Sequence, residues 1–151
     1  MNRPTGRPFP GSGLPEGGPP PLRRALVVDD EPSIRLALRR FLVREGWQVD
    51  EADDGRVALA KLLPAPSGTE PPVHYDLIIC DLRMPGCGGV ELHERLRTTR
   101  PEMLRRFIVA TGNAVSEETA EFVRRTMCPV LQKPFELAEL RALVRRITDA
   151  N

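Results

Sequence analysis

The sequence has few of the residues that build disulfide frameworks, zinc sites or membrane spans. Of its 151 residues, three are cysteine and two are histidine, and the odd number of thiols has no zinc-type spacing. We therefore expect reduced cysteines in a cytoplasm. No apolar run approaches the roughly 20 residues needed to cross a bilayer, and the N-terminus lacks the basic-then-apolar order of a signal peptide. The sequence predicts a soluble, cytoplasmic protein without a membrane partner.

An excess of charge of either sign is also missing. Lysine and arginine number 22 against 21 aspartate and glutamate, a net charge of +1. Residues 1–24 contain four arginines and one glutamate, which leaves 18 basic and 20 acidic residues in the rest of the chain. Arginines in the rest of the chain are spread over several predicted elements and interleaved with glutamate. This pattern predicts solvated faces, with no direct binding of nucleic acid.

Proline and glycine are concentrated at the N-terminus. Residues 1–21 hold 7 of the 16 prolines and 5 of the 12 glycines, with very little that could be buried. Such a segment cannot offset the entropy lost on ordering. We expect residues 1–22 to be a disordered tail and residues 23–151 to form one domain.

The domain alternates short apolar runs with segments of helical spacing. Pro32 stands where a helix could begin, and Gly46 closes the segment, in which Ile34, Leu38, Phe41 and Leu42 form one apolar face. The last segment also has helical spacing, with Leu137, Leu140, Val144 and Ile147 on one face. Ser116 predicts an N-cap for a helix with Ala120, Val123 and Met127 on its buried side. The runs that predict strands are 25–28, 47–51, 77–80, 107–110 and 130–132. Five strands alternating with five helices predict an α/β fold with a doubly wound, five-stranded parallel sheet.

Polar residues follow four of the five predicted strands. They are Asp29 with Asp30, then Asp81, Thr111 and Lys133. Because the carboxyl ends of parallel strands meet at one end of a sheet, where ligands bind, we expect these side chains to converge. Crowded carboxylates repel one another unless a hard cation joins them, and oxygen ligands suit Mg²⁺. The sequence therefore predicts a Mg²⁺ site.

These residue types together suit phosphoryl transfer. Charge on the transferred group must be stabilised by a metal, a cation and hydrogen-bond donors. Asp81 can act as the nucleophile, Lys133 supplies a compact positive charge and Thr111 a hydroxyl. Gly112, without a side chain, leaves its backbone N–H open to a phosphoryl oxygen. Taken singly, an Asp-Asp pair is more often a helix-capping loop, and a threonine in a turn more often makes a local backbone bond.

Four motifs in this order resemble the response-regulator receiver family of bacterial two-component systems. They are Val27-Val28-Asp29-Asp30-Glu31, Cys80-Asp81-Leu82-Arg83-Met84-Pro85, Ala110-Thr111-Gly112 and Lys133-Pro134-Phe135. The resemblance covers residues 24 to about 148. It implies a flavodoxin-like sheet in the order 2-1-3-4-5, and phosphorylation of Asp81 by a phosphohistidine followed by slow hydrolysis.

The resemblance also implies roles for individual residues. Asp30 and Asp81 bind Mg²⁺ directly, together with the backbone carbonyl of Arg83, whereas Asp29 acts mainly through water. Lys133 pairs with the acyl phosphate, and Thr111 moves towards it when the domain switches. Arg83 and Asn113 flank the attacking water and set the lifetime of the phosphate.

The chain departs from the family pattern in a few places. Val130 stands where many members carry the tyrosine or phenylalanine that reports the threonine movement. Gly88 replaces an acidic residue that is often present, which we expect to loosen the loop. The segment 127–130 resembles receivers fused to hybrid sensor kinases and favours a relay role over transcription control.

Other functions fit the sequence less well. Haloacid-dehalogenase-like phosphatases need a second aspartate two residues after the nucleophile, where this chain has Arg83, so we do not expect an enzyme. A docking-only receiver would lack an acidic or lysine position, and none is lost. His74 and His93 have no expected partners at the strand ends, Cys80 is expected to be buried in its strand, and Cys87 is expected to be exposed.

The resemblance implies a sensor histidine kinase, a histidine phosphotransfer protein, or both, as partners. The output surface is expected to be the last two helices with the strand between them. Met1 and the tail favour a free-standing single-domain regulator over a receiver detached from a hybrid sensor kinase. A monomer and a phosphorylation-dependent dimer are both compatible with the sequence.

Overall fold

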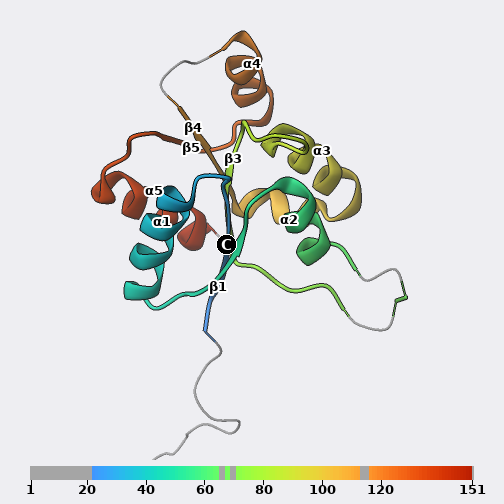
Figure 1. Cartoon of the computed structure of the whole chain (residues 1–151), viewed down its shortest axis with the longest axis horizontal. Coiled ribbons are helices and arrows are strands. Elements are labelled where there is room, and N and C mark those ends of the chain that lie inside the picture. The colour runs from blue at the N-terminus through green and yellow to red at the C-terminus, as the bar shows by residue number, and fades with distance from the viewer. Residues whose placement is uncertain (1–21, 65–66, 69–70, 113–115, 151) are drawn as a thin grey trace, which may run out of the picture.

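The structure, a computed structural model, describes residues 22–64, 67–68, 71–112 and 116–150 (Figure 1). The predicted tail, 1–22, therefore lies outside the described residues except for Leu22, which is exposed. The predicted site residue Asn113 lies outside them as well. Among the described residues, no helix has both the length and the apolar character that a membrane crossing requires.

Five parallel strands form one sheet in the order β2-β1-β3-β4-β5. This confirms the predicted doubly wound α/β fold and its strand order. The strands are β1 (Arg24–Val28), β2 (Gln48–Ala52), β3 (Leu77–Asp81), β4 (Phe107–Thr111) and β5 (Val130–Gln132). The helices are α1 (Pro32–Arg44), α2 (Gly55–Leu62), α3 (Gly89–Thr99), α4 (Glu117–Thr126) and α5 (Leu137–Ala150).

The sheet is covered on both faces, because alternate residues of each buried strand point to opposite sides. In β1, Ala25 and Val27 pack on one side, and Leu26 and Val28 on the other. The first side meets apolar residues of α1 and α5, and the second meets those of α2, α3 and α4. Figure 1 shows α1 with α5 on one side of the sheet and α2 with α3 on the other. The pairing Val28↔Cys80 makes β1 and β3 end side by side.

The buried face of α4 differs from the prediction. Thr119 and Phe122 are its buried residues, whereas Ala120 and Val123 are half-buried and Met127 is 80% exposed. The prediction for Met127 was wrong because the helix ends at Thr126. Met127 is the C-cap, with a left-handed backbone (φ 58) that turns its side chain away from the helix face. Ser116 is the N-cap, as predicted, and its hydroxyl accepts a hydrogen bond from the Thr119 N–H at 3.1 Å.

Two further details were not foreseen. Residues Pro101–Arg106 form a 3-10 helix, η2, directly before β4, in a segment where no element was predicted. Cys87 is buried, against the expectation of an exposed thiol. Its backbone carbonyl accepts a hydrogen bond from Gly55 N–H at 3.1 Å, so the start of α2 covers it. Only a glycine fits at position 55, because a Cβ there would overlap the Cys87 thiol.

Candidate functional site

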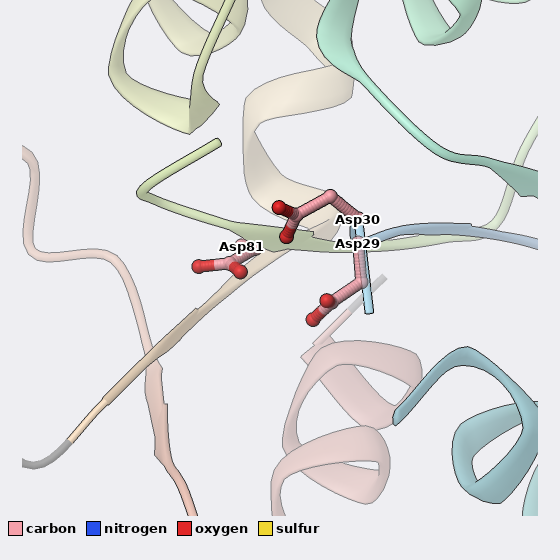
Figure 2. A group of neighbouring side chains, drawn as sticks. All are labelled: Asp29, Asp30 and Asp81. Carbon is pink, nitrogen blue, oxygen red and sulfur yellow. The ribbon is translucent and has the colours of Figure 1, made fainter. Parts of the chain in front are cut away.

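Three carboxylates meet at the carboxyl end of the central strands. Asp29 and Asp30 follow β1 directly, and Asp81 is the last residue of β3. One oxygen from each of the three side chains lies within 4.8 Å of the others. Figure 2 shows the carboxylates of Asp29 and Asp30, which follow β1, and of Asp81, at the end of β3, extending to the same side. We call these three residues the acidic cluster.

Lys133 supplies positive charge to the acidic cluster. Its Nζ lies 2.8 Å from Asp29 Oδ2 and 3.0 Å from Asp81 Oδ2. The contact with Asp29 is an ion pair without hydrogen-bond geometry, whereas Nζ donates a hydrogen bond to Asp81. Lys133 is held in place because its backbone N–H donates to the Thr111 carbonyl at 2.7 Å, just beyond β5. The cation thus faces two nearly buried carboxylates.

Backbone groups orient the two carboxylates that contact Lys133. Asp29 Oδ1 accepts a hydrogen bond from the Glu31 N–H at 2.9 Å, and Asp81 Oδ1 accepts one from the Arg83 N–H at 3.1 Å. Each aspartate therefore caps the loop that follows its own strand. The second oxygen of each carboxylate, Oδ2, faces Lys133 Nζ.

For both Asp81 and Lys133, burial and the contact between the two side chains shift the pKa in opposite directions. Burial raises the pKa of Asp81, and hydrogen bonds from the Arg83 N–H and from Lys133 offset part of this effect. The neighbouring Asp29 raises the pKa of Asp81 further. For Lys133, burial alone lowers the pKa, but the contacts with Asp29 and Asp81 outweigh it and raise the pKa above its usual value. Lys133 is therefore a cation at neutral pH.

Thr111 and Gly112 lie next to the cluster in the sheet. Asp81 pairs with Ala110 in the register, and the Leu82 N–H donates to the Ala110 carbonyl at 3.0 Å, so the end of β4 lies beside the end of β3. Thr111 is buried, whereas Gly112 is exposed and a Cβ at its position would meet nothing within 4 Å. The structure thus brings Thr111 and Lys133 to the same end of the sheet as the three aspartates.

Three carboxylates are a suitable donor set for a hard divalent cation. Oxygen ligands gathered at the carboxyl ends of β1 and β3 fit Mg²⁺, which prefers carboxylates and retained waters. The nearby Cys80 thiol takes no part, because it is buried, its Sγ lies 3.3 Å from the Asp81 carbonyl oxygen, and burial raises its pKa. The residues present therefore fit a Mg²⁺ ion better than a thiol-binding metal.

Sequence reasoning missed two residues that support the cluster. Glu31 Oε1 lies 3.3 Å from Lys133 Nζ, so a third carboxylate forms an ion pair with this lysine. Arg35 had been predicted to lie on a solvated face, but its side chain is only 19% exposed. Its Nη1 donates to the Asp29 carbonyl oxygen at 2.6 Å, and its Nε donates to Glu51 at 3.2 Å. Arg35 lies in the first turn of α1, so its side chain can reach back to the loop before the helix. Its place shortly after the Asp29-Asp30 motif could have indicated this contact.

The two histidines do not join the acidic cluster. His74 is exposed in the loop before β3, and its Nε2 lies 3.1 Å from Asp76 Oδ1. His93 is buried in α3, edge-on to the rings of Phe107 and Phe122, with centroid distances of 5.3 and 5.1 Å. Both positions agree with the expectation that neither histidine has a partner at the strand ends.

A doubly wound sheet with an acidic cluster and a lysine at the ends of its strands defines a class of signalling domain. A family model described as the response regulator receiver domain matches residues 25–145. The chain belongs to this family, and it is a receiver domain of two-component phosphorelay signalling.

The curated relatives include proteins of different architecture. The chain is 33% identical to the transcriptional regulatory protein ResD of Bacillus subtilis over 132 residues, which cover 85% of this chain and 50% of ResD. It is 35% identical to the sensor protein EvgS of Escherichia coli over 116 residues, or 77% of this chain and 9% of EvgS. The chain thus spans half of the length of ResD and a small part of EvgS.

Solved structures support the fold independently. The chemotaxis protein CheY4 of Vibrio cholerae matches with a TM-score of 0.68 and 28% identity, covering 84% of this chain and 99% of that one. A CheY-like receiver domain protein of Methanospirillum hungatei matches with a TM-score of 0.72 and 28% identity, covering 86% of this chain and 96% of that one.

Proposed function

We propose that Asp81 is the phosphoacceptor of this receiver domain and that its phosphorylation requires Mg²⁺. One observation carries the proposal: the Asp81 carboxylate lies among the oxygens of the acidic cluster and 3.0 Å from Lys133 Nζ. Asp30, Asp81 and the backbone carbonyl of Arg83 are the proposed direct ligands, with Asp29 acting mainly through water. When bound, Mg²⁺ neutralises charge on the phosphoryl group.

The transfer is a displacement at phosphorus. A carboxylate oxygen of Asp81 attacks the phosphorus of a phosphohistidine, the new O–P bond forms as the P–N bond breaks, and the imidazole leaves with its electron pair. Lys133 pairs with the oxygens of the resulting acyl phosphate. The Thr111 hydroxyl donates a hydrogen bond to a phosphoryl oxygen, and the Gly112 backbone N–H offers a second one. Slow hydrolysis returns the free carboxylate, so the domain is a switch without catalytic turnover of other substrates.

The proposed phosphodonor is a sensor histidine kinase, a histidine phosphotransfer protein, or both. The proposed output is a protein contact or a phosphorelay step through α4, β5 and α5, without direct binding of nucleic acid. Glutamates interleave with the arginines on these helices, which supports a protein partner. The protein is proposed to be a monomer or to dimerise on phosphorylation.

The form of the protein is a separate proposal. We favour a free-standing regulator, because the match with CheY4 covers 99% of that chain, so a structure of this fold can consist of little else. The relative EvgS supports the alternative, a receiver within a sensor protein. An immunoblot of cell extract with an antibody to the domain separates them: a band of the size of 151 residues supports the free-standing form, and a much larger band contradicts it.

The deciding experiment for the chemistry uses acetyl phosphate, a small-molecule phosphodonor, with and without Mg²⁺. Intact mass is expected to show a Mg²⁺-dependent gain of one phosphoryl group that is absent from Asp81→Asn. Asp149→Asn, an exposed change on α5, is the matched control and should be phosphorylated like the wild type. Phosphorylation of Asp81→Asn, or no phosphorylation and no beryllofluoride binding by the wild type, would contradict the proposal.

A further inference from the structure

A concave site lies at the opposite end of the sheet from the acidic cluster. It has a volume of about 880 Å³. Leu104 and Arg105, which line it, lead into β4, and Cys128 and Pro129 lead into β5. These residues therefore lie at the amino ends of the strands, whereas Asp81 lies at a carboxyl end. A ligand in this pocket would not compete directly for the acidic cluster.

Positive charge converges on this pocket from four separate elements. Its arginines are Arg97 of α3, Arg105 of η2, Arg125 of α4 and Arg146 of α5. We call the site that they line the arginine pocket. None of the described residues lining the arginine pocket is acidic. Just outside the lining, Glu94 contacts Arg97 at 2.9 Å and Arg125 at 3.0 Å, so one carboxylate serves two guanidinium groups.

The remaining lining is largely apolar. It includes Leu104, Met127 and Ile147, and Met127 is 80% exposed. The pocket thus combines cations with an apolar surface. Arginine fits both parts of an amphiphilic ligand, because its guanidinium group pairs with phosphate in a bidentate manner and stacks on flat rings.

A buried histidine in the wall has hydrogen-bonding capacity that the described protein does not use. His93 is 5% exposed, and its Nδ1 has no hydrogen-bond partner among the described residues. Burial lowers the pKa of His93, so the ring is neutral at pH 7 and the charge of the pocket comes from its arginines. Unsatisfied buried polar atoms are uncommon in folded proteins, and each one calls for an explanation. His93 is one of the residues that line this pocket.

We propose that the arginine pocket binds a small organic polyanion with an apolar body, of the chemical class of nucleoside polyphosphates. Its volume falls within the roughly 300–1,000 Å³ typical of small-molecule sites. The arginines surround a concavity, whereas arginines that bind nucleic acid form a stripe along a face or a helix. This inference does not depend on the phosphorylation of Asp81.

Calorimetric titration of the full chain with guanosine triphosphate tests the proposal. EDTA is present, so that no divalent cation can carry the nucleotide to the acidic cluster. Guanosine triphosphate is expected to bind, with weaker binding at high salt because the charges are partly exposed. Guanosine alone is expected not to bind, and inorganic pyrophosphate should compete with the triphosphate but bind more weakly. No detectable binding of the triphosphate, or equal binding of guanosine, overturns the proposal.

Two pairs of neighbouring arginines provide matched controls. All four of these arginines are exposed, but Arg146→Gln and Arg125→Gln change residues that line the pocket, whereas Arg145→Gln and Arg124→Gln make the same charge change outside its lining. Each pocket variant is expected to bind the triphosphate about tenfold more weakly, the loss of one charge-assisted hydrogen bond, and each control should bind like the wild type. Thermal unfolding checks that all four variants are folded. If both variants of a pair bound the triphosphate equally weakly, the nucleotide would be attracted to the basic surface in general, which would contradict a specific site in the pocket.

Binding of guanosine triphosphate to the arginine pocket should be independent of the phosphorylation of Asp81. Asp81→Asn is expected to bind guanosine triphosphate with unchanged affinity, although it does not accept a phosphoryl group. A loss of binding in Asp81→Asn would show that the nucleotide had bound at the acidic cluster and would contradict the proposal. The two sites can therefore fail independently.

Discussion

At the level of single residues, Asp30 differs from the other two aspartates of the acidic cluster. Lys133 contacts Asp29 and Asp81, whereas Asp30 is exposed and forms no ion pair with a described residue. Asp30 therefore adds negative charge to two carboxylates that already share one cation. Its contribution to stability should be unfavourable until a metal ion joins the cluster.

Asp30→Asn should have opposite effects without and with Mg²⁺. In EDTA we expect the free energy of unfolding to rise by about 0.5 kcal/mol, because the change removes the repulsion between the exposed Asp30 carboxylate and those of Asp29 and Asp81. With excess Mg²⁺ the wild type should gain stability through binding and the variant should gain less. Urea denaturation measures both, with Asp149→Asn as the control. A variant that is less stable than the wild type in EDTA would contradict this account of the cluster.

His93 should make the stability of the fold depend on pH. Burial lowers the pKa of His93 below its ordinary value of 6.5, so the unfolded chain takes up a proton at a higher pH than the folded chain does. The contribution of neutral His93 is therefore fully present above pH 6.5 and is lost as the pH falls below it. The slope can reach about 1.4 kcal/mol per pH unit.

His93→Gln should flatten this dependence between pH 7.5 and pH 5.5, because glutamine does not titrate. Urea denaturation at the two pH values gives the difference in unfolding free energy for each protein. His74→Gln changes the other histidine, which is exposed, and should leave the difference close to that of the wild type. An equal effect of the two changes would show that burial of His93 is not the cause.

At the level of elements, the start of α3 depends on close backbone contact with the end of β3. A Cβ on Gly89 would lie 2.7 Å from the Asp81 carbonyl oxygen, and a Cβ on Gly88 would lie 2.7 Å from the Leu82 carbonyl oxygen. Gly89 N–H donates to the same Leu82 carbonyl at 3.1 Å. Gly88 was expected to loosen its loop, but the glycine pair has a packing role that an acidic side chain at position 88 could not fill without movement.

Gly89→Ala should destabilise the domain by about 1–3 kcal/mol, the usual cost of overpacking. It should also slow phosphorylation of Asp81 by acetyl phosphate, because the methyl group pushes against the backbone that carries the aspartate. Urea denaturation and intact mass over time measure the two effects. Gly112→Ala is a control for stability, since a Cβ there meets nothing within 4 Å. Unchanged stability of Gly89→Ala would contradict the packing argument.

At the level of the whole molecule, the described residues contain two complete apolar layers around the sheet. Both layers are built from residues 25–147. The composition of residues 1–21, rich in proline and glycine, offers little to add to either layer. We expect a chain that begins at Leu22 to unfold with the same free energy, within about 0.5 kcal/mol, and to accept a phosphoryl group at the same rate. Urea denaturation and intact mass check this, and a clear loss of stability would show that the N-terminal residues pack on the domain.

The sequence by itself determined the class of fold and the residues that gather at its functional end. Short apolar runs alternating with helical spacing leave few arrangements other than a parallel sheet, and a parallel sheet brings the ends of its strands together. Asp29, Asp30, Asp81, Thr111 and Lys133 could thus be grouped from their positions along the chain. The motifs also indicated the receiver family, which residues 25–145 match.

Only the tertiary structure decided what each side chain contacts. Arg35 lies on the same helical face as exposed arginines, and only the direction in which α1 leaves the sheet brings it to the Asp29 carbonyl. Met127 continues an apolar spacing, but the left-handed cap at that residue removes it from the core. The arginine pocket gathers residues from four elements, α3, η2, α4 and α5, which together span more than fifty residues of the sequence. Such groupings depend on how helices pack at the ends of the sheet, which residue spacing within one element cannot specify.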